Sequence, residues 1–196
     1  MRDQIAAIEG EYRRYKALGE AAMQQLGAAE LCQSPRPKAQ SPTPNEEGDN
    51  TIAAIVAHLQ GNLESRFTDF LTTDGEKAWR KREEEFAGRD ESRAQVMDRW
   101  NRGWNAVLAA LGGLTDANLF DTITIRSQPL RVDAALYRSL AHTSYHVGQI
   151  VYIAKSFRGA AWHSLSIPKG KSDEYARNPR DESPAGHARH LAGRGG

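Results

Sequence analysis

The sequence predicts an all-α fold: an antiparallel four-helix bundle with a short β-ribbon before the last long helix. Four segments carry apolar residues at intervals of three and four positions, the spacing that one buried face of a helix requires. Stretches rich in proline, glycine or charge separate these segments, which favours helices of ordinary globular length. The 196 residues suffice for one sizeable core. We therefore expect a single domain over residues 1–175 and a flexible C-terminal tail over residues 176–196.

The first predicted helix begins near Ile5, and a surface loop between Cys32 and Asn50 follows it. The apolar positions of this helix are Ile8, Tyr12, Tyr15, Leu18, Ala22 and Leu26. Four of the eight prolines lie in the loop. Because proline lacks a backbone N–H and has a fixed φ, no regular element is expected there.

The second predicted helix follows a capping residue, Asp49 or Asn50, and combines an apolar stripe with a line of polar side chains. The stripe consists of Ile52, Ile55, Leu59, Leu63, Phe67 and Phe70. The polar line consists of His58, Asn62, Arg66 and Asp69. A buried polar group without a partner costs about 1–3 kcal/mol, so this line indicates an internal polar network, a ligand pocket, or both. A structural salt bridge from Arg66 to a carboxylate is the alternative.

The third predicted helix begins at a capping box formed by Ser92 and Gln95 and ends at Gly112 and Gly113. Its regularly spaced tryptophans are interpreted as core residues, with an aromatic stripe that lines a cofactor as the alternative. The charged segment before this helix, residues 72–91, predicts a structured loop with a helical turn.

Residues 122–126 alternate in polarity, are rich in β-branched side chains and precede the turn-forming sequence Ser-Gln-Pro, which predicts a two-stranded ribbon. Asp133 is the expected cap of the fourth helix. The apolar face of that helix consists of Leu136, Leu140, Val147, Ile150, Val151 and Ala154.

The fourth predicted helix also carries a pair of histidines, His142 and His146. Residues four apart on a helix lie one above the other, so two ring nitrogens can converge on a single point. In a bundle whose second and fourth helices face each other, His58 adds a third imidazole. Ordinary, partly buried histidines are the alternative interpretation.

Three imidazoles suit a divalent ion such as zinc, nickel, cobalt or iron. Three neutral ligands leave the full charge on the ion and at least one position for water or substrate, as in catalytic sites. Such an ion can bring a water or a thiol to its anionic form near neutral pH and can polarise a carbonyl.

The segment after the fourth helix, from Trp162 to Ser172, mixes apolar, basic and hydroxyl side chains. Gly170 between two lysines suggests an anion site, for which a solvated loop is the alternative because the full phosphate-loop spacing is absent. His163 is a candidate fourth ligand for a closed metal site. Beyond residue 176, His187 and His190 are expected to lie in the tail.

The composition excludes several classes of protein. A net charge of +1 gives no general attraction to nucleic acid or anionic membrane. The single cysteine, Cys32, excludes an intramolecular disulfide and fits a reducing compartment. No leader-like segment and no run of about 18 apolar residues is present, so we expect a soluble cytoplasmic protein.

Three stretches carry a resemblance to a known group of proteins. They are HLQGNLESRFTDFLTTDGEK from His58, HTSYHVGQI from His142 and WHSLSIPKGK from Trp162. Together these resemble an uncharacterised branch of the DinB-like superfamily of metal-binding four-helix proteins, a name unrelated to the DNA polymerase that shares it. The resemblance covers roughly residues 1–175, and the proline-rich loop and the arginine- and glycine-rich tail depart from the compact pattern.

The resemblance implies that His58, His142 and His146 bind a divalent metal, zinc or nickel, and that the protein forms a homodimer. Characterised members of the superfamily include transferases that join a low-molecular-weight thiol to an electrophile. We therefore expect a metal-dependent enzyme that activates a small thiol or water, such as a thiol S-transferase acting on a small molecule. The expected substrate-binding residues are Asn62, Arg66, Trp162 and Lys169. A metal-dependent hydrolase of a small amide or ester, and a non-catalytic ligand-binding protein stapled by its metal, are the alternatives.

Overall fold

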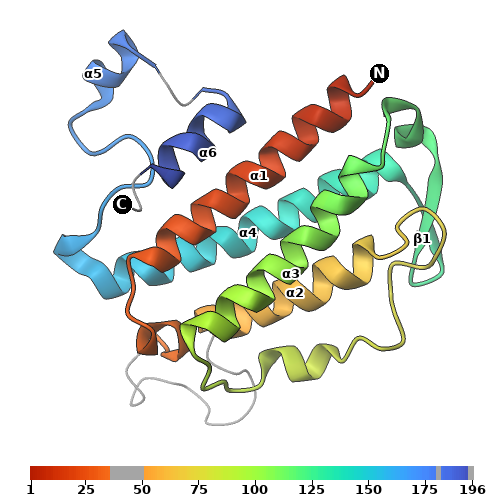
Figure 1. The fold of residues 1–196 in the computed structure, drawn as a ribbon, viewed down its shortest axis with the longest axis horizontal. Coiled ribbons are helices and arrows are strands. Elements are labelled where there is room, and N and C mark those ends of the chain that lie inside the picture. Colours follow the sequence, from red (N-terminus) through yellow and green to blue (C-terminus); the bar gives the residue numbers. More distant parts are fainter. Residues whose placement is uncertain (36–50, 180–181, 194–196) are drawn as a thin grey trace.

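Four long helices lie side by side in the computed structural model, which describes residues 1–35, 51–179 and 182–193 (Figure 1). The long helices are α1 (Asp3–Gln24), α2 (Ile52–Phe67), α3 (Arg93–Gly112) and α4 (Val132–Arg158). The short elements are η1 (Ala29–Cys32), η3 (Arg82–Phe86), η4 (Asp116–Phe120), β1 (Thr122–Ile125), β2 (Gln128–Arg131), η5 (Gly159–Ala161), α5 (Ser172–Arg177) and α6 (Pro184–Ala192). The mainly helical fold with a two-stranded antiparallel ribbon before a long helix confirms the predicted fold class.

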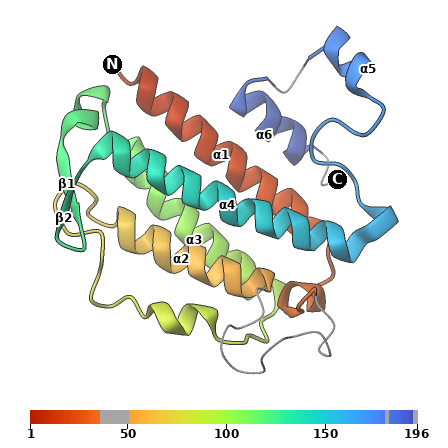
Figure 2. The ribbon, with the colours of Figure 1, turned by 180° about the vertical axis from the view of Figure 1, so that it is seen from behind.

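The bundle is antiparallel between two pairs of helices and parallel within each pair, because α1 and α4 point one way and α2 and α3 point the other (Figures 1 and 2). Helices α2 and α3 are therefore parallel, and they share the most extensive helix-to-helix contact of the described fold. The connection over residues 68–92 travels back along the bundle to make this possible. It includes η3, which confirms the helical turn expected in the charged segment and lies against α2.

One aromatic cluster joins all four long helices. The ring of Tyr12 on α1 lies edge-on to Phe67 of α2 and to Trp104 of α3, with centroids 6.2 and 6.4 Å away. Its hydroxyl donates a hydrogen bond of 3.1 Å to the carbonyl of Leu136 on α4. Trp104 also contacts Trp100, and both are fully buried. The tryptophans of the third helix are thus core residues, as expected from their spacing.

The residue that caps the start of the helix is the predicted one for α3 and a different one for α2 and α4. Ser92 and Gln95 form the predicted capping box of α3. Helix α2 is capped by the hydroxyl of Thr51, which accepts the N–H of Ala54, whereas the expected caps at residues 49 and 50 lie outside the described residues. Asp133 is not the cap of α4: the extended backbone of β2 leads directly into Val132, and Asp133 lies in the first turn.

The tight turn of the hairpin is held by a carboxylate from the connection between α2 and α3. Arg126 and Ser127 have φ values of 54° and 59°, as a two-residue hairpin turn of the primed class requires. The carboxylate of Asp74 accepts the backbone N–H groups of both, at 2.8 and 2.7 Å. The ribbon is therefore fastened to residues 69–77.

The C-terminal segment is more ordered than the predicted tail, because α6 packs on α1. Ser183 accepts the N–H of Gly186 and Pro184 occupies the first helical turn, which together form a good helix start. Leu191 is 1% exposed, and the ring of the buried His187 donates a 2.9 Å hydrogen bond to the carbonyl of Leu165. Apolar burial and a satisfied polar group thus explain why residues 184–192 form a helix. No helix of the described segments has the length and apolar character needed to cross a membrane.

A close backbone approach fixes the spacing of α2 and α3. A Cβ at Gly103 of α3 would lie 2.9 Å from the Cα of Gln60 on α2. The substitution Gly103→Ala is expected to lower the free energy of unfolding by about 1–3 kcal/mol, because a backbone atom cannot move without the helix. Urea denaturation of the variant measures the loss.

The matched control is Gly148→Ala on α4, where an added Cβ meets nothing within 4 Å. Since alanine favours helix over glycine, this variant should gain about 0.5–1 kcal/mol. Equal stability of the two variants would contradict the tight crossing.

Candidate metal centre

Three histidines meet between α2 and α4, as the sequence predicts. The Nε2 atom of His142 lies 3.2 Å from Nε2 of His58 and 3.1 Å from Nε2 of His146. One ligand atom from each of the three residues lies within 4.8 Å of the others. His58 is 6% exposed, whereas His142 and His146 are partly exposed. The cluster therefore lies at the edge of the core and faces solvent on the α4 side.

The spacing of the nitrogens fits a metal ion. Around an ion about 2.0–2.1 Å from each imidazole nitrogen, neighbouring ligand atoms are separated by roughly 2.9 Å in octahedral and 3.3–3.4 Å in tetrahedral geometry. The two observed separations lie within this range. Two of the three nitrogen pairs therefore already lie at ligand separations, and the third pair, within 4.8 Å, needs only to approach for the histidines to hold one metal ion.

The outer nitrogens of two rings determine where their protons lie. Nδ1 of His58 is 2.9 Å from Oε2 of Glu85, and Nδ1 of His146 is 2.7 Å from Oε1 of Gln149. Because these oxygens only accept hydrogen bonds, both Nδ1 atoms carry the proton and both Nε2 atoms present a lone pair. Nδ1 of His142 is buried and has no hydrogen-bond partner in the described part of the chain.

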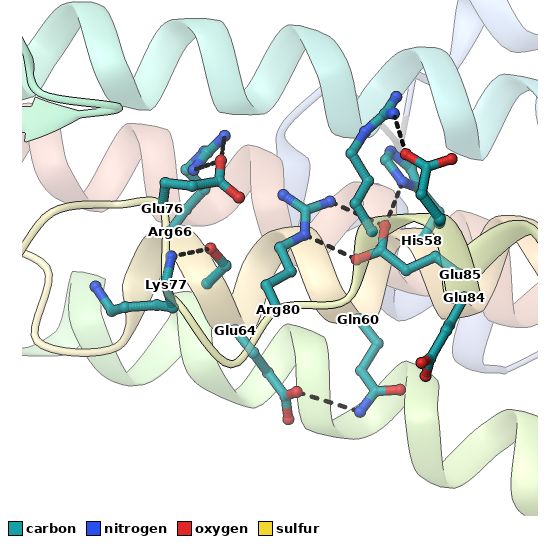
Figure 3. A network of polar contacts seen from close by, with 12 residues as sticks. His58, Gln60, Glu64, Arg66, Glu76, Lys77, Arg80, Glu84 and Glu85 are labelled. Atoms are coloured by element: carbon teal, nitrogen blue, oxygen red, sulfur yellow. Dashed lines mark hydrogen bonds and ion pairs between the residues drawn. The ribbon is translucent and has the colours of Figure 1, made fainter.

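Glu85 of η3 stands behind His58 and is itself held by an arginine (Figure 3). Arg80 donates from Nε to Oε1 at 2.7 Å and from its terminal nitrogen to Oε2 at 2.9 Å. Burial acts to raise the pKa of Glu85, but the hydrogen bonds from His58 and Arg80 outweigh it and lower the pKa overall. The ring of Phe86 stacks on His58 with a centroid separation of 5.0 Å.

Glu85, Arg80 and Phe86 belong to this site but are not among the residues predicted from the sequence. Glu85 is the last of three consecutive glutamates in a segment without helical or strand periodicity. No local pattern distinguishes it from its two exposed neighbours. The aromatic residue that follows it, Phe86, is the one signal in the sequence that marks where this segment turns inward.

The two histidines of α4 resist protonation. Burial lowers the pKa of both His142 and His146 to about 4, and the neighbouring imidazoles add to the effect. For His146 the hydrogen bond to Gln149 opposes part of this change. Both rings are therefore neutral near pH 7, which is the form that binds metal.

The metal-free protein is expected to lose stability as the pH falls from about 6.5 to about 4. In this window the unfolded chain binds protons at both histidines and the folded protein does not, so protonation favours unfolding. Urea denaturation with a chelator present, at pH 7.5 and pH 5, measures the difference. A His142→Asn/His146→Gln double variant should lose less between these pH values, and an identical loss would contradict the assignment.

Arg66 and Asn62 lie on the same helix as His58. Arg66 forms an ion pair of 3.2 Å with Glu76 (Figure 3), and it also donates to the carbonyl of Gly75. The structural salt bridge considered as an alternative for Arg66 is therefore present. Asn62 is partly exposed and makes no hydrogen bond to the described residues, so its amide is free for a ligand.

The structure does not bring the segment after α4 to the histidines. Helix α4 continues for 12 residues from His146 to Arg158, which is about 18 Å of helix, before Trp162 is reached. His163 exchanges hydrogen bonds of its backbone with the side chain of Gln25, at the end of α1. Its side chain is exposed, it is not part of the histidine group, and Lys169 is exposed on the same loop.

Comparison with known proteins gives one result that bears on identity. The family model described as "Protein of unknown function (DUF1572)" matches residues 2–171. Comparison with curated proteins and with solved structures found no match. Since the family match spans all four long helices and the three histidines, the protein belongs to the DUF1572 family.

Proposed function

We propose that the protein is a metal-dependent enzyme of the DinB-like superfamily, with His58, His142 and His146 as the ligands of a zinc or nickel ion. The observation that carries the proposal is the convergence of three imidazole Nε2 atoms, two of which present lone pairs. The motifs that resemble the superfamily include all three residues. The partial exposure of His142 and His146 leaves a route for a small molecule to the remaining coordination positions.

An ion with three neutral ligands keeps its double charge and can lower the pKa of a water or thiol ligand. The residues of the chain would then bind and orient the substrates. Asn62 and Arg66 lie one and two turns from His58 on the polar edge of α2, where a free amide and, once it leaves its pair with Glu76, a cation can hold an anionic cosubstrate. This arrangement suits a thiol S-transferase.

The test is a turnover assay with purified protein reconstituted separately with Zn²⁺ and Ni²⁺. The protein is offered several bacterial low-molecular-weight thiols together with a chromogenic electrophile, and His146→Ala is the control. The proposal expects thiol-dependent turnover well above the control with at least one metal. No turnover above His146→Ala across the panel would contradict it.

The same assay separates the alternatives from the leading proposal. Release of a chromophore from an ester or amide without added thiol would favour a hydrolase. Metal binding that stabilises the protein without any turnover would favour a non-catalytic role. In that role the ion would join α2 to α4, because its ligands come from both helices. Homodimer formation stays a prediction, and light scattering coupled to size-exclusion chromatography measures it.

A further inference from the structure

We propose that Glu85, clamped by Arg80, is a positioning residue that fixes the orientation and tautomer of His58 for metal binding. This inference rests on the proposed metal site and assigns a role to a side chain outside the ligand set. Glu85 lies behind Nδ1 of His58, on the far side of the ring from Nε2, so it does not compete for the ion. A metal-ligating histidine that donates its other N–H to a carboxylate is more basic and better oriented than a free one.

The carboxylate is held in place by contacts that leave it little freedom. Arg80 forms a two-pronged ion pair with it, and the side chains of Arg80 and Glu85 are 2% and 8% exposed. The charges of this pair cancel, so the pair can remain buried next to a cation. The presence of such a buried ion pair is only weak evidence that the pair stabilises the fold. The third contact, to Nδ1 of His58, gives the pair a further role.

The backbone of α2 makes room for the carboxylate. A Cβ at Gly61 would lie 2.2 Å from Oε1 of Glu85, which no real contact permits. Gly61 is three residues from His58, on the next turn of α2. The absence of a side chain there therefore allows Glu85 to lie against the helix at the level of the His58 ring.

The ring of His58 is held by two contacts of different kinds. The hydrogen bond to Glu85 fixes the edge of the ring, and the stacked ring of Phe86 covers one face. Because Glu85 and Phe86 are adjacent in η3, both contacts come from one turn. The orientation of Nε2 toward His142 thus depends on where this turn docks on α2.

Two variants test the proposal in different ways. Glu85→Gln keeps the shape of the side chain but removes its charge. Gly61→Ala changes no polar group but displaces the carboxylate, and a cavity of about 300 Å³ lined by Gly61, Arg80 and Glu85 can accept the displaced side chain. The matched controls are Glu84→Gln, whose side chain is 69% exposed, and Gly148→Ala, where an added Cβ has open space.

Two measurements are made on each full-length variant. Long-range ¹H–¹⁵N correlation spectra of the metal-free protein report which nitrogen of His58 carries the proton. Competition with a chromophoric chelator gives the dissociation constant for Zn²⁺. We expect a single Nδ1–H tautomer in the wild type, a mixture in both test variants, and Zn²⁺ affinity reduced by about 10- to 100-fold in both. The controls should match the wild type.

The outcomes separate the two proposals. If the wild type binds Zn²⁺ and both test variants keep its affinity and its tautomer, the role of Glu85 is refuted and the metal site stands. If the wild type binds neither Zn²⁺ nor Ni²⁺, the proposed function itself is refuted. A loss of stability in the metal-free Glu85→Gln variant without a change of tautomer would also refute the positioning role, because it would show only a structural ion pair.

Discussion

Replacing His58 with alanine is expected to reduce the affinity for Zn²⁺ or Ni²⁺ by more than about 100-fold, which exceeds the usual loss on removing an outer-shell partner. His58 is the one ligand of the cluster on α2, so its removal leaves two imidazoles on a single helix. It also leaves Glu85 and Arg80 buried without the histidine. Elemental analysis of the wild type beside the His58, His142 and His146 alanine variants measures the effect, and one bound ion per chain in His58→Ala would contradict it.

The same variant should lose the thermal stabilisation that metal provides. A ligand present at about 1,000 times its dissociation constant stabilises the folded state by about 4 kcal/mol if it does not bind the unfolded chain. Helix α2 contacts α4 much less than it contacts α3. An ion held between α2 and α4 would therefore strengthen the weaker of the two junctions. Melting curves with and without metal should differ for the wild type, and the difference should be much smaller for His58→Ala.

Trp104→Ala is expected to lower the free energy of unfolding by about 3–5 kcal/mol, as large-to-small changes of buried aromatic residues do. Trp104 is fully buried and contacts Tyr12 and Trp100. The loss should lie nearer the lower value, because the indole N–H has no hydrogen-bond partner among the described residues and its removal costs nothing. Urea denaturation measures the change.

The control for this variant is Trp79→Ala, since the side chain of Trp79 is 54% exposed. Its effect should remain within about 0.5 kcal/mol, as for most surface substitutions. A loss below about 1 kcal/mol for Trp104→Ala would contradict the central role of the aromatic cluster.

The histidine cluster could be predicted because its information is local and regular. The spacing of His142 and His146 and the place of His58 beside an apolar stripe both follow from helix periodicity. The direction of α3 relative to α2 could not be predicted in this way, because either direction buries the same stripes. Periodicity also gives no information about Glu85, which comes from a turn without a repeat.

For the C-terminal segment, a local signal for a helix start was present in the sequence, but the composition of the surrounding residues obscured it. Ser183 and Pro184 are a recognisable helix start. The surrounding arginine and glycine residues resemble a solvated tail, and a helix of nine residues is stable only when it packs on a partner. The partner surface on α1 is a tertiary property that the segment alone does not reveal.

The parallel arrangement of α2 and α3 has a consequence for which changes of length the chain can accept. Two parallel helices cannot be joined by a tight turn, because the chain must first travel back over the full length of the first helix. In this protein the return path supplies Arg80, Glu85 and Phe86, so the same residues close the topology and surround His58. A deletion in this path would therefore alter both the folding of the chain and its metal chemistry. The connection cannot be shortened by engineering without affecting both.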